Sequence, residues 1–217
     1  MKIQSNGLLH QHVLDALTKE YIVVKPFPHL TELIYCLTRS YFDRTDPLPP
    51  TDNELLLFSV GFGLERVMIT TMPIEPMVVD GINITPDFLP SYTEGGPPGE
   101  LKSTRMKPPT SIETINLPES WVEQIMGYCK ASKVTEYDLA VMHIIPADLK
   151  TYRLSFDQEE IDSFWTEYVL ERRNYYLEAV ALLQQPTAFQ WCKEWECKNC
   201  RYRLRCDVQA SARRHGT

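Results

Sequence analysis

The spacing of apolar residues predicts helices over the first third of the chain. Leu9 to Tyr21, His29 to Phe42 and Asn53 to about Thr71 each repeat apolar positions at helical intervals. The third segment is mostly apolar despite Gly61 and Gly63, and these glycines indicate close packing against a neighbouring element. We therefore expect three helices before the first strand.

Short runs with strand character follow these helices. They cover Met77 to Val79, Ile82 to Leu89 and Gly99 to Ser103, and turn-prone residues at Asp80-Gly81 and at Glu94 to Pro98 separate them. Because each strand is short and each connection contains turn residues, this order predicts a meander of three neighbouring strands.

The second half of the chain returns to longer elements. Pro118 to Ala131 carries its apolar residues on one helical face, and Tyr137 to Ile145 is rich in Val, Ile and Leu, as strands are. A strand, a helix and a strand in this order favour a crossover within a mixed sheet. Ser155 and Gln158 form a candidate capping box for a long helix that ends near Pro186. The predicted class is α/β, with a central mixed β-sheet flanked by helices.

The composition is typical of one packed unit. The chain has 217 residues, of which 43% are hydrophobic and 11% aromatic, which is enough for one domain or one domain with a small annex. Its start lacks the features of a secretory signal, and its longest apolar run, near Leu55 to Leu64, is too short to span a bilayer. We expect a soluble cytoplasmic protein without membrane association. In a reducing compartment its six cysteines indicate metal or redox chemistry rather than disulfides.

The net charge of −7 is unevenly distributed along the chain. Residues 187–217 hold seven Lys or Arg and three Asp or Glu, whereas residues 1–186 hold fifteen and twenty-six. The carboxyl-terminal segment is therefore a basic tail. Charge alone leaves two interpretations open, a solvated surface and a contact for nucleic-acid phosphates.

A carboxylate and an amine lie two residues apart in the third predicted strand. Side chains alternate across a strand, so Glu100 and Lys102 project from one face, and an adjacent strand that bears Asp87 can place a second carboxylate beside them. Hard oxygen ligands suit Mg or Mn, which hold a scissile phosphate and lower the pKa of an attacking water. The lysine then orients that water or offsets charge on the phosphate. The alternative is a pair of solvated charges on the wet face of a sheet.

Gln124 and Tyr128 are four residues apart on the helix predicted after that strand. Residues at this spacing point along one stripe of a helix, where an amide and a hydroxyl can contact a phosphate or hold a catalytic carboxylate in place. The alternative is a half-buried tyrosine beside a solvated glutamine.

The cysteines near the carboxyl terminus have metal-ligand spacing. Cys197, Cys200 and Cys206 supply three thiolates within a short segment, and Cys36, within the second predicted helix, is the distant candidate for a fourth ligand. Cys192 competes for that role, because its spacing to Cys197 and Cys200 also resembles a plant-type ferredoxin. Spacing alone leaves zinc, an iron-sulfur cluster and unliganded buried thiols open.

In combination these motifs resemble the RecB-like exonucleases of the PD-(D/E)xK superfamily. The likeness is to the CRISPR-associated, iron-sulfur branch of that group and its phage relatives, and it runs from about Phe27 to Cys206. The order of motifs is more specific than any single one. It comprises the Leu-Thr-Glu-Leu-Ile-Tyr-Cys-Leu-Thr-Arg segment around Cys36, Pro86-Asp87, Gly99-Glu100-Leu101-Lys102, Gln124 with Tyr128, and the three terminal cysteines.

The resemblance implies a fold and a role for each motif residue. It implies a restriction-endonuclease-like nuclease core at residues 76–155, preceded by a helical region at 1–75 and followed by a helix and cysteine-rich tail at 156–217. These segments would form one compact unit joined by a 4Fe-4S cluster. The implied roles are metal ligation by Asp87 and Glu100, catalysis by Lys102, support by Gln124 and Tyr128, and cluster binding by Cys36, Cys197, Cys200 and Cys206.

The implied activity is exonucleolytic. Such enzymes act on single-stranded DNA ends, commonly from 5' to 3', with Mn or Mg as the hydrolytic metal. Members linked to CRISPR arrays trim prespacers together with integration proteins, and phage relatives process or recombine DNA. For this chain the setting, whether CRISPR adaptation, phage or repair, stays open, as does homo-oligomer formation. The basic tail would contact DNA through Arg201, Arg203 and Arg205, while Trp191, Trp195 and Tyr202 would either stack on bases or pack around the cluster.

One departure from the family pattern lies in the helix before the strands. The family usually has a His four residues after a Gly as a further metal ligand, whereas this chain has Glu65 after Gly61. A carboxylate is an acceptable ligand for Mg or Mn, and a surface salt bridge is the alternative role for Glu65. The difference also supports a rival function, a DNA-binding or assembly subunit with little or no activity. A zinc-stabilised interaction module is a third interpretation.

Overall fold

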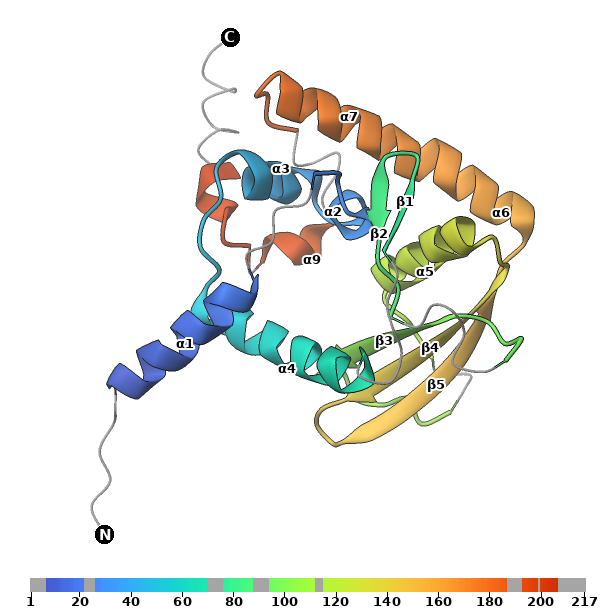
Figure 1. The fold of residues 1–217 in the computed structure, drawn as a ribbon, viewed down its shortest axis with the longest axis horizontal. Helices are drawn as coiled ribbons and strands as arrows, with labels where there is room; N and C mark the ends of the chain where they lie inside the picture. Colours follow the sequence, from blue (N-terminus) through green and yellow to red (C-terminus); the bar gives the residue numbers. More distant parts are fainter. Residues whose placement is uncertain are drawn as a thin grey trace.

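The chain folds as a mixed α/β protein in which helices flank a small sheet that lies at one edge of the molecule (Figure 1). The computed structural model describes residues 7–21, 26–69, 76–87, 94–111, 115–186, 193–198 and 200–206. Among these residues, no helix has both the length and the apolar character needed to cross a bilayer.

The main sheet has three strands in the order β3-β4-β5 and is mixed. Strand β3 (Gly99–Thr104) pairs in parallel with β4 (Glu136–His143), and β4 pairs antiparallel with β5 (Asp148–Ser155). Every second residue of β4 is buried, so one face of the strand packs on the core. Helix α5 (Glu119–Ser132) connects the parallel strands β3 and β4, which confirms the predicted strand-helix-strand order.

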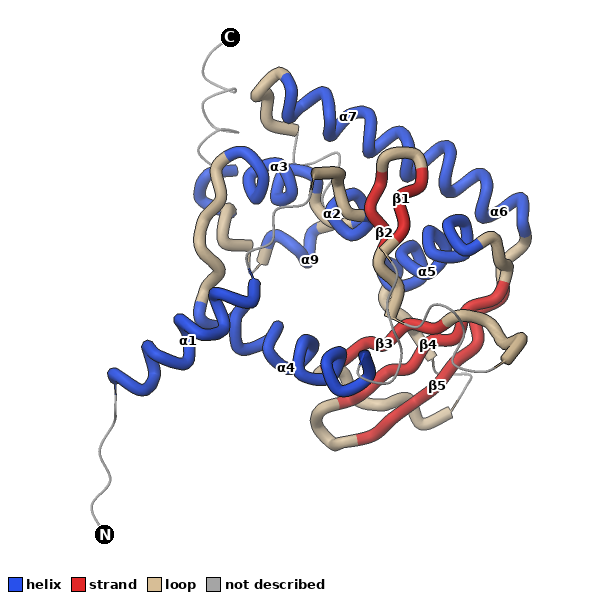
Figure 2. The backbone as a smooth tube through the Cα atoms, viewed as in Figure 1, coloured by secondary structure: helices blue, strands red, loops and turns tan. Residues whose placement is uncertain are grey.

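The predicted meander is wrong in its third strand. Strands β1 (Met77–Val79) and β2 (Ile82–Ile84) form a hairpin of their own, whereas β3 pairs with β4 in the other sheet (Figure 2). Strand β2 also ends earlier than expected, because Pro86 has no N–H to donate to a ladder. Residues 88 and 89 of that predicted strand lie outside the described residues.

The amino-terminal helices agree with the pattern except at Cys36. Helix α1 (Gly7–Tyr21) and helix α4 (Asp52–Ile69) are present as predicted, but the expected helix over 29–42 is two helices, α2 (Leu30–Ile34) and α3 (Leu37–Thr45). Cys36 is therefore the residue that caps α3 rather than a residue inside a helix.

Buried Arg172 explains the break between α2 and α3. The residue is 5% exposed, and its guanidinium donates hydrogen bonds to the carbonyls of Leu33, Ile34 and Tyr35, at 2.7 Å for Tyr35. These carbonyls would bond to later N–H groups if the helix continued. Because Arg172 is remote in sequence, local apolar spacing could not predict the break.

A long helical rod packs over α2 and α5 (Figure 1). It runs through α6 (Gln158–Ser163), the π-helical segment η2 (Phe164–Val169) and α7 (Leu170–Ala181). The long helix was predicted, but the capping box was not correct. Ser155 is the last residue of β5, and the residue that caps α6 is Asp157.

Helix α5 lies at the centre of the core. Ile125, Tyr128 and Cys129 on this helix are almost completely buried. At Gly127 an added Cβ would lie 2.6 Å from a methyl group of Leu30, so the absence of a side chain lets α5 and α2 approach closely. The close packing of α5 against α2 fixes the position of the helix that carries Gln124 and Tyr128. Gly63, by contrast, faces open space, so the predicted close packing there is wrong.

Candidate active site

Glu100 is the buried centre of a polar network at the start of β3. Its side chain is almost entirely buried, and the residue is 3% exposed. Its Oε1 accepts hydrogen bonds from Lys102 Nζ at 2.5 Å and from Gln124 Nε2 at 3.2 Å. The predicted pairing of Glu100 and Lys102 on one strand face is thus present, but the pair is buried rather than solvated as the alternative required.

Asp87 lies beside Glu100, although not on a strand. The prediction placed it on a strand adjacent to Glu100, whereas the structure places it in a bend after β2. Two hydrogen bonds hold that bend against β3: Leu101 N donates to Asp87 Oδ2 at 2.8 Å, and Asp87 N donates to Glu100 Oε2 at 3.3 Å. Each carboxylate therefore accepts a hydrogen bond from the backbone of the segment that carries the other carboxylate, so the two side chains lie side by side.

Gln124 and Tyr128 support Glu100 from helix α5. Gln124 Nε2 also lies 2.5 Å from the Tyr128 hydroxyl, and that hydroxyl donates to the carbonyl of Thr85 at 3.4 Å. Gln124 is 4% exposed and Tyr128 is 1% exposed, so the alternative of a solvated glutamine beside a half-buried tyrosine is wrong. The helix ties Glu100 to the segment that carries Asp87.

Two residues near this network were not identified from the sequence. His29 caps α2 and hydrogen-bonds through Nε2 to the Thr85 hydroxyl at 2.9 Å, which links α2 to the Asp87 segment. Tyr35, which ends α2, lies close enough to Lys102 to act on its pKa. His29 lies just outside the motif segment around Cys36, and Tyr35 lies within it but was given no role of its own. Only the position of Tyr35 next to Cys36 could have drawn attention to it.

Burial dominates the electrostatics of the site. It raises the pKa of Glu100 to about 7, an effect that Lys102 opposes and Asp87 reinforces. Burial also raises the pKa of Asp87, against the opposing N–H of Leu101 and the charge of Lys102. For Lys102, burial lowers the pKa, but the charge and hydrogen bond of Glu100 outweigh it, so the pKa ends above its ordinary value. The lysine therefore stays cationic.

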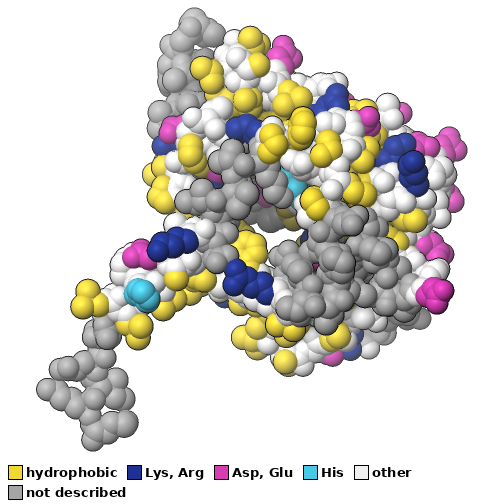
Figure 3. Space-filling model, viewed as in Figure 1, with side chains coloured by type: hydrophobic (Ala, Val, Ile, Leu, Met, Phe, Trp, Pro, Cys, Tyr) yellow, Lys and Arg dark blue, Asp and Glu magenta, His cyan; other side chains and the backbone are white. Residues whose placement is uncertain are grey.

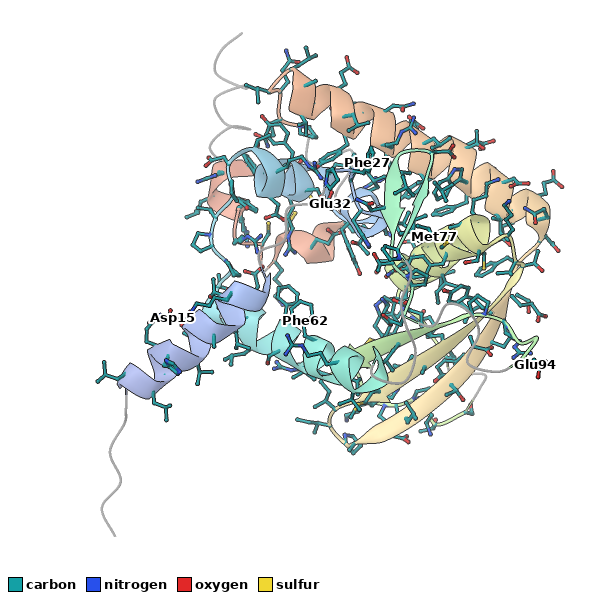
Figure 4. The ribbon with its side chains drawn as sticks, in the orientation of Figure 1. Asp15, Phe27, Glu32, Phe62, Met77 and Glu94 are labelled. Atoms are coloured by element: carbon teal, nitrogen blue, oxygen red, sulfur yellow. The ribbon has the colours of Figure 1, made fainter. Side chains whose placement is uncertain are left out.

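A cavity of about 430 Å³ opens onto these groups between β3 and α4. Asp87, Glu100 and Lys102 lie on its polar wall, while α4 contributes an apolar wall that includes Phe58 and Phe62. Figure 4 shows Phe62 projecting from α4 toward the space between that helix and the rest of the protein. In Figure 3 apolar side chains gather over α4 beside a hollow in the surface. The volume is within the range of about 300–1,000 Å³ that is usual for ligand sites.

Glu65, the candidate substitute for the family histidine, lies on the same helix. Its side chain is outside the described residues, so its role as a ligand stays a prediction. Gly61, Phe62 and Leu64, which precede it on α4, line the cavity.

Three of the four predicted cluster cysteines, Cys36, Cys197 and Cys200, lie near one another where α3 meets the carboxyl-terminal segment. Cys36 is buried between α2 and α3, Cys197 ends α9 (Glu194–Cys197), and Cys200 and Cys206 are half-buried. Burial raises the pKa of Cys200, and Cys36 and Cys197 raise it further, so these thiols are close enough to interact electrostatically. Within the described ranges, however, no three His, Cys, Asp or Glu side chains form a metal-binding group. Cys192 lies outside those ranges.

Only some of the tail side chains predicted to contact DNA are accessible on the surface. The side chain of Arg201 is 5% exposed and forms ion pairs with Asp43 and Glu54, so its prediction as a DNA contact is wrong. Tyr202 is fully buried and stacks on Phe42 with ring centroids 5.2 Å apart, so its predicted stacking on DNA bases is wrong. The other predicted arginine contacts and the two tryptophans differ from Arg201 and Tyr202. Arg205 pairs with Asp46, Arg203 is exposed, and the side chains of Trp191 and Trp195 lie outside the described residues.

Comparison with known proteins identifies a shared fold. No protein-family model and no curated protein matches the chain. Among solved structures it is similar to one described as the crystal structure of SSO0001, with a TM-score of 0.55 and 16% sequence identity. The match covers 93% of this chain and 97% of that chain. At this identity the likeness shows the fold alone, and it extends over nearly the whole length of both proteins.

The buried carboxylate predicts a pH-dependent stability. Folding raises the pKa of Glu100 from 4.5 to about 7, so the folded protein holds a proton that the unfolded chain releases between these values. This proton uptake adds to the free energy of unfolding. The added stability is fully present below about pH 4.5 and is lost as the pH rises through 7, and it amounts to at most about 3 kcal/mol. Urea unfolding of metal-free protein from pH 4.5 to 8 measures it. Glu100→Gln should flatten the decline, and an equal decline in both proteins would contradict this assignment.

Proposed function

We propose that the protein is a Mg- or Mn-dependent deoxyribonuclease that hydrolyses phosphodiester bonds at the ends of single-stranded DNA. One observation carries the proposal. Buried Glu100 is held by Lys102 and Gln124 beside the Asp87 carboxylate, at the wall of a cavity. Two carboxylates and one lysine in this arrangement agree with the chemistry and the family resemblance inferred from the motifs.

The carboxylates Asp87 and Glu100 would hold the metal. Two anionic groups at one wall would repel a phosphodiester, and a hard divalent cation held by Asp87 and Glu100 would offset that repulsion. When bound, the ion would supply Lewis acidity and would lower the pKa of the attacking water. Burial raises the pKa of Asp87 and raises the pKa of Glu100 to about 7, so a bound cation would favour the ionised form of Glu100 near neutral pH.

Lys102 has the position and the charge for a catalytic role. Its ammonium remains protonated, lines the cavity and has a side chain that is 19% exposed. It can therefore donate to an attacking water or to the phosphate oxygen on which negative charge develops. Gln124 and Tyr128 would act through Glu100, because their hydrogen bonds fix its carboxylate. The pKa of Tyr128 is raised well above its usual value by burial, so its phenol stays a neutral donor.

The resemblance extends the proposal beyond the hydrolytic site. It supplies the exonucleolytic mode, the 5' to 3' direction, a role in CRISPR prespacer processing or in phage and repair DNA processing, and CRISPR integration proteins as partners. It also supplies a 4Fe-4S cluster held by Cys36, Cys197, Cys200 and Cys206. The electrostatic proximity of three of these thiols fits such a cluster, since soft thiolate ligands select iron-sulfur clusters or zinc. The cluster would join α3 to the tail as a structural element.

The catalytic assignment predicts different results for two lysines. Lys102→Ala should lower Mn-dependent digestion of end-labelled single-stranded DNA by about 100-fold or more, because it removes a charged group from the reaction. Lys150 is a matched control, since it also follows a carboxylate by two residues on a strand and lies 2.9 Å from Asp148, but its side chain is 38% exposed and does not line the cavity. Lys150→Ala should retain activity. Equal activity of both variants would contradict the role of Lys102, and no digestion by the unmodified protein would favour a DNA-binding subunit.

The cluster assignment predicts iron and acid-labile sulfide in anaerobically purified protein. Cys36→Ala and Cys200→Ala should each lose most of the iron, because a thiolate ligand is removed. Cys129→Ala is the matched control. Cys129 is fully buried in the core, and burial raises its pKa to about 12, so its loss should leave the iron content unchanged. Zinc without sulfide would contradict the iron-sulfur assignment.

A further inference from the structure

The cavity at the catalytic residues is divided into two chemically different walls. Lys102, Ser103, Thr104 and Arg105 follow one another along the end of β3 and supply amine, hydroxyl and guanidinium groups. The facing wall is the apolar side of α4. A nucleotide has the same division, with an anionic phosphodiester at one end and a flat apolar base at the other.

Two phenylalanines form the aromatic part of the α4 wall. Phe58 and Phe62 are four residues apart, and their ring centroids are separated by 6.3 Å at an interplanar angle of 41°. Phe62 is 39% exposed, whereas Phe58 is half-buried. The tilt between the rings does not leave parallel faces for a base between them. A base can instead stack on the exposed face of Phe62, with Phe58 holding that ring in place.

Gly61 keeps the space between the two walls open. It lies next to Phe62 on the cavity lining, and an added Cβ would be 4.0 Å from the Ser103 hydroxyl. A larger side chain at this position would extend toward β3 and narrow the cavity. The helix therefore presents an aromatic ring beside a position without a side chain, directly opposite the strand that carries Lys102.

We propose that Phe62, supported by Phe58, is the stacking surface for an unpaired base next to the phosphate that is cleaved. This inference rests on the proposed nuclease function and names the recognition element of its site. The exposed charge of Arg105 on the opposite wall serves a neighbouring backbone phosphate. Base stacking on an aromatic ring tolerates any sequence but requires an unpaired base, so Phe62 selects single-stranded ends without reading their sequence.

Fluorescence of 2-aminopurine tests the contact without hydrolysis. Single-stranded oligonucleotides with this base at the 5' end or at the 3' end are titrated with the full-length Lys102→Ala protein. Stacking should quench the fluorescence at the end that enters the site. When Phe62→Ala is introduced into the Lys102→Ala protein, the quenching should disappear and binding of the oligonucleotide should weaken roughly five- to one-hundred-fold. Phe62→Trp should preserve the quenching and the binding affinity. Phe62→Leu, which keeps an apolar side chain without a ring, should lose both the quenching and the affinity.

Val60→Ala is the matched control for this titration. Val60 is on the same helix and 40% exposed, but it is not among the residues that line the cavity, so its replacement should leave quenching and binding unchanged. Full binding and quenching with Phe62→Leu or Phe62→Ala would overturn the proposal. A change in sedimentation mass on Phe62→Ala with unchanged quenching would also overturn it, because the helix face would then be a contact between copies of the chain.

Steady-state digestion separates this inference from the nuclease function itself. In the catalytically competent protein, Phe62→Ala should raise KM for single-stranded DNA with a much smaller effect on kcat, and this penalty should vanish on a substrate with an abasic end. Phe62-dependent quenching by a protein that cleaves no DNA would support stacking and refute the nuclease. Cleavage with KM and quenching unaffected by Phe62→Ala would support the nuclease and refute the role of Phe62.

Discussion

The removal of the Glu100 carboxylate from water is the constraint on which the rest of the site depends. An isolated buried carboxylate is unstable, and this one is compensated by an ammonium on its own strand, an amide from α5 and an N–H from the segment after β2. Each compensating group comes from a different element. Moving the strand, the helix or the bend would remove one of these partners and leave the buried carboxylate less well compensated. The three elements are therefore fixed relative to one another.

The same arrangement reaches the cysteine region through α2. His29 begins this helix and bonds to Thr85 beside the site, while the end of the helix is held by Arg172. Cys36 follows immediately, and its backbone N–H donates to buried Glu196 on α9 at 2.7 Å. A short helix fixed at both ends thus connects the proposed catalytic centre to the region of the proposed cluster.

Local periodicity was sufficient to predict only part of this structure. The two-residue repeat of a strand and the four-residue repeat of a helix correctly paired Glu100 with Lys102 and Gln124 with Tyr128, because both depend on geometry within one element. Asp87 was predicted near Glu100 but on the wrong element, and the break before Cys36 was missed. Both depend on hydrogen bonds between residues that are distant in sequence. Strand β5 was missed because it alternates between half-buried and exposed positions and includes several polar residues. The aromatic wall of α4 was visible in the sequence only as an apolar helix.

If the Asp87 and Glu100 carboxylates together bind a catalytic divalent ion, calorimetric titration of the metal-free protein with Mn²⁺ should detect one site. Glu100→Gln should weaken that site at least tenfold, because the substitution removes an anionic ligand while it preserves the shape of the side chain. The variant Glu136→Gln, at an exposed position on β4, should bind as the unmodified protein does. Absence of binding, or the same affinity in Glu100→Gln as in the unmodified protein, would show that these carboxylates do not form a metal site.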